Sequence, residues 1–147
     1  MPNTISNRVE GKVALIAGGA HAIETSLMGF AGLAALEIAR GGGKIMIGDI
    51  DDIAGEQSAK NMREAGLTAD YSHLDVTSES DWISVVEKTS SLHGHLDIMI
   101  MAAGINNRGE TIETVTVPKW RQVMDVTNLG MFLGAVSYTH LTLPTKA

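Results

Sequence analysis

The feature that most constrains the fold is an alternation of strand-like and helix-like segments along the chain. Four segments have strand character, at residues 13–19, 44–49, 69–76 and 96–104. Three are mainly apolar runs that end in glycine or aspartate, which is typical of strands buried on both faces. The segments between them have helical length and periodicity, and this pattern indicates a parallel sheet with helices on both faces. We therefore predict an α/β fold, an open doubly wound parallel sheet that stops after its fourth strand and the following helix.

Helices are predicted at about residues 30–40, 53–65, 78–91 and 118–135. Glycines at positions 41–43 and Gly66 would end the first two helices. Ser78 is expected to cap the third helix, and Pro118 to occupy the first turn of the fourth. In the first helix the apolar positions are Phe30, Leu33, Ala34 and Ile38. In the third helix the positions expected to face the sheet are Trp82, Val85, Val86 and Leu92.

Composition excludes several classes of protein. The chain has 147 residues, 44% of them hydrophobic and 19% charged, which suits one globular domain. A net charge of −6 without a basic cluster argues against nucleic-acid and anionic-membrane partners. There is no cysteine, no signal-like segment and no apolar run of roughly 20 residues that could span a bilayer, so we expect a soluble cytoplasmic protein. We expect no metal site, and surface or capping roles for His21, His73, His93, His95 and His140.

Glycines and carboxylates collect at the carboxyl ends of the predicted strands, where ligands bind in sheets of this kind. Gly18 and Gly19 follow the first strand, Gly29 and Ala31 belong to a second glycine-containing segment, and Asp49 ends the second strand. Glycine lets the backbone approach a pyrophosphate. A carboxylate about 20 residues beyond the glycines would accept hydrogen bonds from ribose hydroxyls and repel a 2′-phosphate.

Asp75 and Val76 end the third predicted strand, where they would contact an adenine ring. Each feature also has a simpler explanation, because glycines can serve only as turns and Asp49 can be a solvated helix-capping acid. The occurrence of all three features at consecutive strand ends favours a dinucleotide site.

The segments that carry these features resemble the short-chain dehydrogenase/reductase family over about residues 9–135. The matching stretches are GKVALIAGGA (11–20), GDID (48–51), LDVTSESDW (74–82), LDIMIMAAGI (96–105) and WRQVMDVTNLGMFLG (120–134). The resemblance implies a Rossmann-like fold and hydride transfer between an alcohol and a carbonyl, with a small-molecule alcohol or ketone as substrate. It also implies a homo-oligomeric full-length protein and, through Asp49, a preference for NAD(H) over NADP(H).

The resemblance assigns cofactor contacts to residues near all four strand ends. They are Gly18, Gly19, Gly29, Ala31, Asp49, Ile50, Asp75, Val76, Ala103 and Gly104. The family's glycine motif is Gly-x-x-x-Gly-x-Gly, and two alignments are open. One keeps the spacing and places Ala22 and Glu24 at the later glycines, whereas the other treats residues 22–28 as an insertion and uses Gly29-Phe30-Ala31. We favour the second, because a Glu24 carboxylate would repel a pyrophosphate.

Two further positions depart from the family pattern. Met101 and Ala102 stand where the family has asparagine at the end of the fourth strand, and a methionine there is expected to fill the core. The catalytic asparagine of the family falls at Thr127, while Asn128 is next to it. One residue is about 100° around a helix, so Asn128 is the candidate catalytic asparagine with its register displaced by one.

The closing stretch, VSYTHLTLPT at residues 136–145, does not supply the rest of the family's catalytic site. That site needs a serine on a fifth strand and Tyr-x-x-x-Lys on a helix, whereas Tyr138 and Lys146 are eight residues apart with Pro144 between them. The stretch resembles the translation of a transposon-end adapter used in DNA sequencing libraries. We therefore expect the genuine protein to end near Gly134, giving one incomplete domain at residues 1–135 and a non-native, disordered tail at 136–147.

Three functional hypotheses follow. The favoured one is the cofactor-binding N-terminal part of an NAD(H)-dependent short-chain dehydrogenase/reductase, inactive by itself because the catalytic serine and Tyr-x-x-x-Lys are missing. The main alternative is a non-enzymatic dinucleotide-binding regulatory or interaction protein of the same fold, since fold does not fix function. A half-domain interaction protein is the third. In each case the fourth strand would be an apolar open edge, which invites association with other chains.

Overall fold

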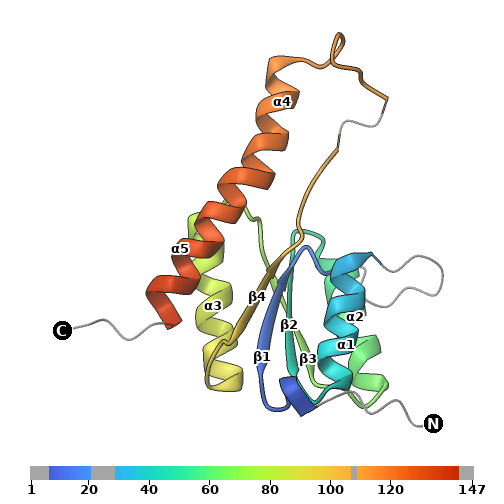
Figure 1. Ribbon diagram of the computed structural model, residues 1–147, viewed down its shortest axis with the longest axis vertical. Helices are drawn as coiled ribbons and strands as arrows, with labels where there is room; N and C mark the ends of the chain where they lie inside the picture. Colours follow the sequence, from blue (N-terminus) through green and yellow to red (C-terminus); the bar gives the residue numbers. More distant parts are fainter. Residues whose placement is uncertain (1–6, 21–28, 107–108, 143–147) are drawn as a thin grey trace.

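The computed structural model describes residues 7–20, 29–106 and 109–142, which follow the predicted alternation (Figure 1). The strands are β1 (Val13–Ala17), β2 (Lys44–Asp49), β3 (Ala69–His73) and β4 (Ile98–Met101). The helices are α1 (Phe30–Arg40), α2 (Asp52–Glu64), α3 (Glu79–His93), α4 (Val117–Met124) and α5 (Gly130–Thr142). A short 3-10 helix, η1 (Asn7–Val9), precedes β1, and a π-helical segment, η2 (Asp125–Leu129), joins α4 to α5.

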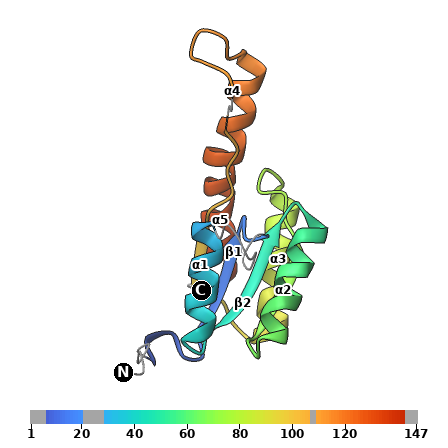
Figure 2. The same cartoon turned by 90° about the vertical axis from the view of Figure 1, so that its right-hand side faces the viewer.

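The strands form one parallel sheet in the order β3-β2-β1-β4. Helices α1 and α2 cover one face, and α3, with α5 beside it, covers the other (Figures 1 and 2). The predicted doubly wound α/β architecture is therefore confirmed. In the described part of the chain β4 pairs with β1 alone, so this entirely apolar strand is an edge of the sheet.

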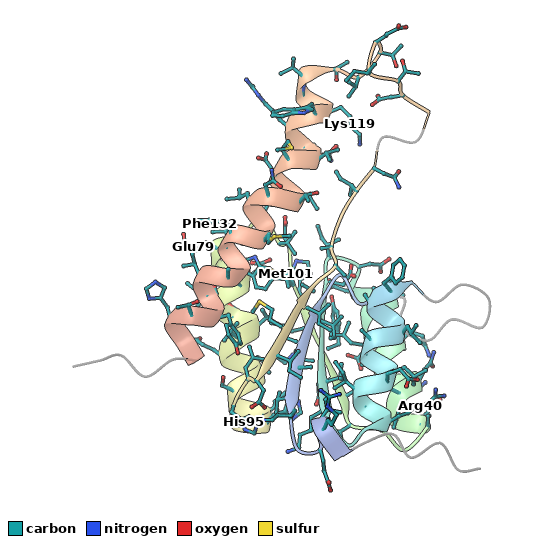
Figure 3. The ribbon with its side chains drawn as sticks, in the orientation of Figure 1. Arg40, Glu79, His95, Met101, Lys119 and Phe132 are labelled. Atoms are coloured by element: carbon teal, nitrogen blue, oxygen red, sulfur yellow. The ribbon has the colours of Figure 1, made fainter. Side chains whose placement is uncertain are left out.

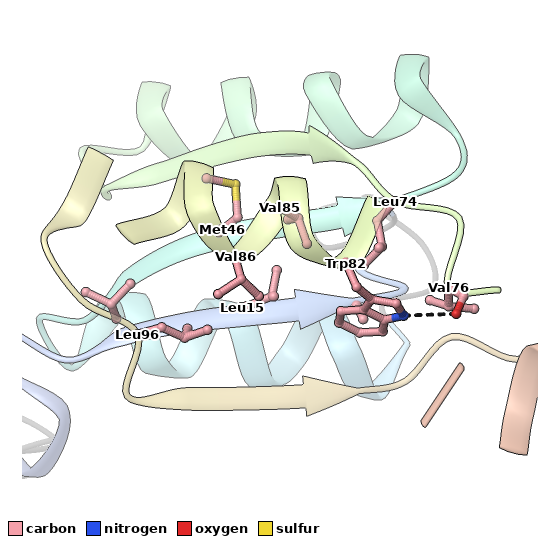
Figure 4. Packing of buried hydrophobic residues seen from close by; sticks show 10 residues of the cluster. Leu15, Met46, Leu74, Val76, Trp82, Val85, Val86 and Leu96 are labelled. Carbon is pink, nitrogen blue, oxygen red and sulfur yellow. Dashed lines mark hydrogen bonds between the residues drawn. The ribbon is translucent and has the colours of Figure 1, made fainter. Parts of the chain in front are cut away.

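The core lies in two layers because successive side chains of a strand point to opposite faces. On β1, Leu15 faces α3 while Ile16 faces α1 and α2, and both are fully buried. Figure 4 shows the α3 layer, in which Trp82 packs beside Leu15. The indole Nε1 of Trp82 donates to the carbonyl of Val76 at 2.9 Å, so the one polar atom of this large side chain is satisfied.

Helix α3 begins where the sequence predicts, and most of its buried face is as predicted. The Ser78 hydroxyl accepts a hydrogen bond from the Asp81 amide as the N-cap, and Trp82, Val85 and Val86 are buried. The prediction for Leu92 is wrong, because its side chain is 54% exposed. Ten residues at about 100° each turn position 92 some 80° away from the direction of Trp82, so this position leaves the face that packs on the sheet.

Helix α1 buries a different face from the one its large apolar residues suggest. Phe30 is 96% exposed and Leu33 is 48% exposed. The buried positions are Gly32, Ala35, Leu36 and Ala39. Small residues on this face let the helix approach the β-sheet closely, and this packing outweighs the burial of the larger side chains at its start.

Three strands are shorter than predicted, and the first of them, β1, ends at Ala17 before Gly18 and Gly19. Strand β3 ends at His73, so Asp75 and Val76 lie in the loop after it and not on the strand. The loop forms because the Asp75 carboxylate accepts hydrogen bonds from the Thr77 amide at 2.9 Å and the Thr77 hydroxyl at 2.7 Å, which turns the backbone away from the sheet. Strand β4 covers Ile98–Met101, the apolar centre of the predicted segment.

The last helical segment is longer than predicted. It runs from Val117 through η2 to Thr142, so the expectation of disorder from Val136 is wrong for the described residues. Ser137 is buried, and the Tyr138 hydroxyl donates to the carbonyl of Asp97 at 2.9 Å. The helix continues because the sequence has no proline between Pro118 and Pro144, and Tyr138 anchors it on the α3 face. The non-native origin of residues 136–147 stays a prediction.

Candidate active site

A cleft of about 360 Å³ opens at the carboxyl ends of the four strands. Seven of the predicted cofactor contacts line it: Gly18, Asp49, Ile50, Asp75, Val76, Ala103 and Gly104. They converge because all four strands are parallel. The segments that follow the strands, from four separate parts of the chain, therefore leave the sheet at the same end. Leu74, Ala102, Ile105, Gln122 and Val126 complete the lining.

Gly18 forms the floor of the cleft where β1 and β4 approach one another. Its backbone has a φ of +84°, and a Cβ atom there would lie 2.5 Å from the backbone nitrogen of Ala103. Its amide donates to the Gly48 carbonyl at 2.8 Å, which fixes the turn after β1. Only glycine satisfies both the positive φ and the close approach.

Gly19, Gly29 and Ala31 do not line the cleft. Gly19 packs toward Ile16 and Ile47 at the base of the turn. Gly29 is the N-cap of α1, and Ala31 is half-buried against the core cluster on the α1 face. The N-terminus of α1 therefore falls at Gly29-Phe30-Ala31, as the alignment with an insertion requires, while Ala22 and Glu24 lie outside the described residues.

Asp49 holds its carboxylate at the rim of the cleft through two backbone hydrogen bonds. Its Oδ2 accepts from the Ala20 amide at 3.0 Å, and its Oδ1 accepts from the Asp51 amide at 3.1 Å. The Ala20 carbonyl in turn accepts a hydrogen bond from the buried Ser58 hydroxyl. The end of β2 is thus tied to the glycine turn, and each carboxylate oxygen keeps a further lone pair for a ligand hydroxyl.

Asp75 and Val76 line the cleft from the loop after β3, beside the end of β2, because the preceding Leu74 amide donates to the Asp49 carbonyl at 2.9 Å. The Asp75 amide donates to Asp81 Oδ2 at 3.0 Å, and this bond lowers the pKa of the Asp81 carboxyl. Val76 is buried, and its carbonyl is occupied by the Trp82 indole. Two side chains of α3 therefore hold the backbone of the loop that carries Asp75 and Val76.

The residues after β4 keep the cleft open because they are small. The Ala102 amide donates to the Ala17 carbonyl at 2.8 Å, after which Ala103 and Gly104 diverge from the sheet and line the cleft. Met101 packs against the core, as predicted for a methionine that replaces the family's asparagine. Figure 3 shows Met101 between the sheet and the last helix.

The structure does not bring Asn128 into the cleft. Asn128 lies in η2, is exposed, and its Nδ2 lies 3.7 Å from the sulfur of Met124. Thr127 instead lines a smaller cavity of about 110 Å³ that includes Met101 and Ala103. The π-helical turn shifts the direction of each side chain by widening the helix, and sequence periodicity gives no signal for it.

The polar residues of the closing stretch also lie away from the cleft. The Tyr138 hydroxyl donates to the carbonyl of Asp97. Asp97 precedes β4, so this contact lies at the amino ends of the strands, whereas the cleft lies at their carboxyl ends. Ser137 is buried in the last helix, and Lys146 lies outside the described residues. The expectation that this stretch is not the family's catalytic serine and tyrosine stays a prediction.

Sequence reasoning missed a polar network beside the cleft. The Tyr71 hydroxyl lies 2.6 Å from Asp52 Oδ1, and His73 Nδ1 lies 2.8 Å from the same oxygen. Burial and the bond to Asp52 raise the pKa of the Tyr71 hydroxyl, and the hydrogen bonds from Tyr71 and His73 lower the pKa of Asp52. The available signal was the two-residue spacing of Tyr71 and His73, which places both side chains on the same face of β3.

Two other kinds of site are absent from residues 7–20, 29–106 and 109–142. This part of the chain has no group of three or more histidine or acidic side chains arranged to hold a metal ion. None of its helices combines the length and the apolar character needed to cross a membrane.

Comparisons with known proteins agree with this arrangement. The family model for short chain dehydrogenases matches residues 12–145. A 3-alpha-(or 20-beta)-hydroxysteroid dehydrogenase of Mycobacterium tuberculosis is 37% identical over 130 residues, which cover 88% of this chain and 46% of that protein. A mitochondrial borneol dehydrogenase of Lavandula x intermedia is 34% identical over 148 residues, covering 100% of this chain and 52% of the relative.

The fold also matches a solved structure. The crystal structure of a short chain dehydrogenase from Mycobacterium smegmatis superposes with a TM-score of 0.81 at 20% identity, covering 92% of this chain and 54% of the other. The chain thus spans about half the length of the relatives that it matches. With the sheet order, the lined cleft and the family match in agreement, the chain belongs to the short-chain dehydrogenase family.

Proposed function

We propose that this chain is the NAD(H)-binding part of a short-chain dehydrogenase that interconverts an alcohol and a carbonyl. The observation that carries the proposal is the convergence of Gly18, Asp49, Asp75 and Ala103 on one cleft at the carboxyl edge of the sheet. The family binds nicotinamide dinucleotides, and the bound cofactor supplies the hydride chemistry. The choice of NAD(H) is our inference from the carboxylate of Asp49.

The residues present fit such a cofactor. Gly18 has no Cβ where a side chain would fill the floor of the cleft, and Ile50 and Val76 give apolar surface for a base. Asp49 has two oxygens that each accept one backbone hydrogen bond and can accept one more from a ribose diol. Its negative charge would repel the 2′-phosphate of NADP(H).

The proton transfer that accompanies hydride transfer requires a general acid or base. The 147 residues contain no Tyr-x-x-x-Lys, and Tyr138 lies at the other edge of the sheet. We therefore propose that the chain by itself binds cofactor without turnover. For the whole protein we propose a small-molecule alcohol or ketone substrate, a homo-oligomer and a cytoplasmic location, with hydroxysteroids and borneol as the first alcohols to test.

A non-enzymatic dinucleotide-binding protein of the same fold is the second candidate. Met101 and Ala102 replace the family's strand-end asparagine, and Asn128 is exposed and does not line the cleft. The discriminating observation is the uninterrupted reading frame in the source DNA. A Tyr-x-x-x-Lys after the fifth strand favours the enzyme, and its absence favours the binding protein.

Cofactor binding tests the proposal directly. We expect the chain, titrated at nanomolar concentration by microscale thermophoresis, to bind NAD(H) more tightly than NADP(H). Asp49→Ala should narrow this preference by about 10-fold, the effect of roughly 1.4 kcal/mol. Glu64→Ala, which changes the net charge equally at the far end of α2, is the matched control and should leave the preference intact. Tighter binding of NADP(H) by the unmodified chain would contradict the assignment.

A further inference from the structure

A line of polar contacts runs behind the cleft from the end of β2 to the loop after β3. It begins at Tyr71, whose hydroxyl lies 2.8 Å from the Asp49 carbonyl and 2.6 Å from Asp52 Oδ1. Both partners are acceptors, so the single hydroxyl hydrogen is shared between the residue that ends β2 and the first residue of α2. Tyr71 itself is held against α2, because its ring packs on Gly55, where any side chain would collide with it.

His73 continues the line from α2 to α3. Its Nδ1 lies 2.8 Å from Asp52 Oδ1, and its Nε2 lies 3.6 Å from Asp81 Oδ2. His73 is the partner of Asp49 in the register of β2 and β3. It therefore lies beside the end of β2, where Asp49 is the residue proposed to bind the ribose. The second contact is an ion pair and not a hydrogen bond, because 3.6 Å exceeds hydrogen-bond range.

Asp81 completes the line to the loop after β3, whose residues Asp75 and Val76 line the cleft. Its Oδ2 accepts the hydrogen bond from the Asp75 amide at 3.0 Å, and its Oδ1 accepts from the Ser78 hydroxyl at 2.9 Å. Thus one carboxylate oxygen faces both His73 and the backbone of the loop that carries Asp75 and Val76. None of the three linking side chains, Tyr71, His73 and Asp81, is among the residues that line the cleft.

We propose that Tyr71, Asp52, His73 and Asp81 form a polar bridge that positions the loop after β3 against the end of β2 in the nucleotide cleft, with His73 as a protonation-dependent positioning residue. The inference rests on the proposed nucleotide function of the cleft. The bridge acts on binding only through Asp49 on one side and the Asp75 backbone on the other. Its members do not touch the ligand.

The proton on His73 decides whether the bridge is continuous. Both partners of the ring, Asp52 on α2 and Asp81 on α3, are carboxylates, and a neutral imidazole can donate from only one nitrogen. The imidazolium satisfies both, whereas the neutral ring turns a lone pair toward one of them. The hydrogen bond to Asp52 raises the pKa of His73, and the charges of Asp52, Asp81 and Asp75 add to this effect. The bridge is therefore closed at mildly acidic pH and opens as pH rises through the elevated pKa.

Binding of ADP-ribose, which is NAD without its nicotinamide ring, tests the bridge on the complete 147-residue chain. Because the His73 side chain is 50% exposed, the expected effect is modest. We expect affinity to fall about two- to fivefold from about pH 6 to about pH 8, the effect of an exposed ion pair titrating with histidine. In His73→Gln the affinity should be low and nearly independent of pH, and in His73→Arg, which keeps a permanent charge and several donors, it should stay high.

His95 supplies the matched control. Its side chain is as exposed as that of His73, and its Nε2 pairs with Asp97 Oδ2 at 2.8 Å. His95 lies near the amino ends of the strands, at the other end of the sheet from the cleft (Figure 3). His95→Gln should keep the pH profile of the unmodified chain. Hydrogen exchange of residues 74–78 should accelerate in His73→Gln and not in His95→Gln, because His73, unlike His95, contacts the carboxylate that accepts from the Asp75 amide.

The outcomes separate the two proposals. A chain that binds ADP-ribose with the same pH profile in His73→Gln as in the unmodified protein overturns the bridge and leaves the nucleotide site standing. A chain that binds no ADP-ribose at any pH overturns the proposed function, and the positioning role of His73 with it. Loss of the profile in both His73→Gln and His95→Gln would assign the effect to general charge and also overturn the bridge.

Discussion

Gly18 and Ala103 approach so closely that a Cβ atom on Gly18 would lie 2.5 Å from the Ala103 backbone nitrogen and 2.6 Å from its Cα. This contact joins the ends of β1 and β4, two strands that are 80 residues apart in the sequence, and it forms the floor of the cleft. Backbone cannot yield as a flexible side chain can, so the contact places a strict limit on the residue at position 18.

We predict that Gly18→Ala destabilises the chain by about 3 kcal/mol, the sum of a left-handed backbone penalty and a clash in a packed interior. Gly11→Ala separates the two contributions, because Gly11 also has a positive φ of +70° but has open space around it. It should cost only about 1–2 kcal/mol. Urea unfolding followed by circular dichroism measures both, and equal losses in the two variants would show that the close approach to Ala103 is not limiting.

Tyr138 is predicted to matter for stability and not for catalysis. The 147-residue chain should show no oxidoreductase turnover with any alcohol and NAD, measured by absorbance of the reduced cofactor. Tyr138→Phe should lower the free energy of unfolding by about 1 kcal/mol, because it removes the hydrogen bond to the Asp97 carbonyl. Turnover that is present in the unmodified chain and lost in Tyr138→Phe would make the tyrosine catalytic and our interpretation wrong.

Asp97 links the beginnings of β1 and β4, and its contribution should depend on pH. Its carboxylate accepts from the Val13 amide at 2.9 Å and from Lys12 Nζ at 3.0 Å. Burial by itself would raise the pKa of Asp97, but the hydrogen bonds from Val13 and Lys12 and the charge of His95 outweigh it and hold the pKa below its usual range. A carboxyl with a depressed pKa stabilises the fold above its unfolded pKa of about 4 and loses this effect as pH falls through the folded value.

Asp97→Asn should therefore cost about 1–2 kcal/mol at neutral pH, the worth of charge-assisted hydrogen bonds. The difference from the unmodified chain should shrink as pH falls below about 4. Unfolding by urea at several pH values gives both quantities. Glu64→Gln, at an exposed ion pair with Lys60, is the control and should change stability by less than about 0.5 kcal/mol. A cost at Asp97 that does not change with pH would contradict the pKa argument.

The chain should associate with itself as its concentration rises. Strand β4 is an edge in the described part of the chain, and three apolar side chains on the last helical segment, Trp120, Met131 and Phe132, are at least half exposed. Apolar surface and unpaired strand edges favour association between chains. Sedimentation velocity should show a shift to larger species that Phe132→Glu reduces.

Phe30→Glu is the comparison for this association, because Phe30 is 96% exposed but belongs to α1, on the face of the sheet opposite the last helical segment. Single exposed apolar residues are common on monomers, so this variant should associate like the unmodified chain. A chain that stays monomeric at every concentration would contradict the prediction and would mean that the edge and the helix face are covered within one molecule.

The part of the candidate site that lies at the carboxyl ends of the strands could be predicted from the sequence. Gly18, Asp49, Asp75 and Ala103 could be assigned to one site from the sequence, because parallel strands must leave the sheet at the same edge. The bridge through Tyr71 and His73 could not be predicted, because it depends on how far the N-termini of α2 and α3 lie from β3, and no local pattern encodes that distance.

The sequence by itself determined the strands, the helix that Ser78 caps and the doubly wound sheet, because alternation, capping and apolar runs act over a few neighbouring residues. Only the tertiary structure decided that Leu92 faces solvent, that Thr127 lines the smaller cavity in place of Asn128, and that the helix continues through Tyr138. Those outcomes depend on rotation about a helix axis and on contacts between distant segments. A shift of one residue turns a side chain about 100° around the helix axis. It changes which side chains face the core but not the local pattern that predicts the helix.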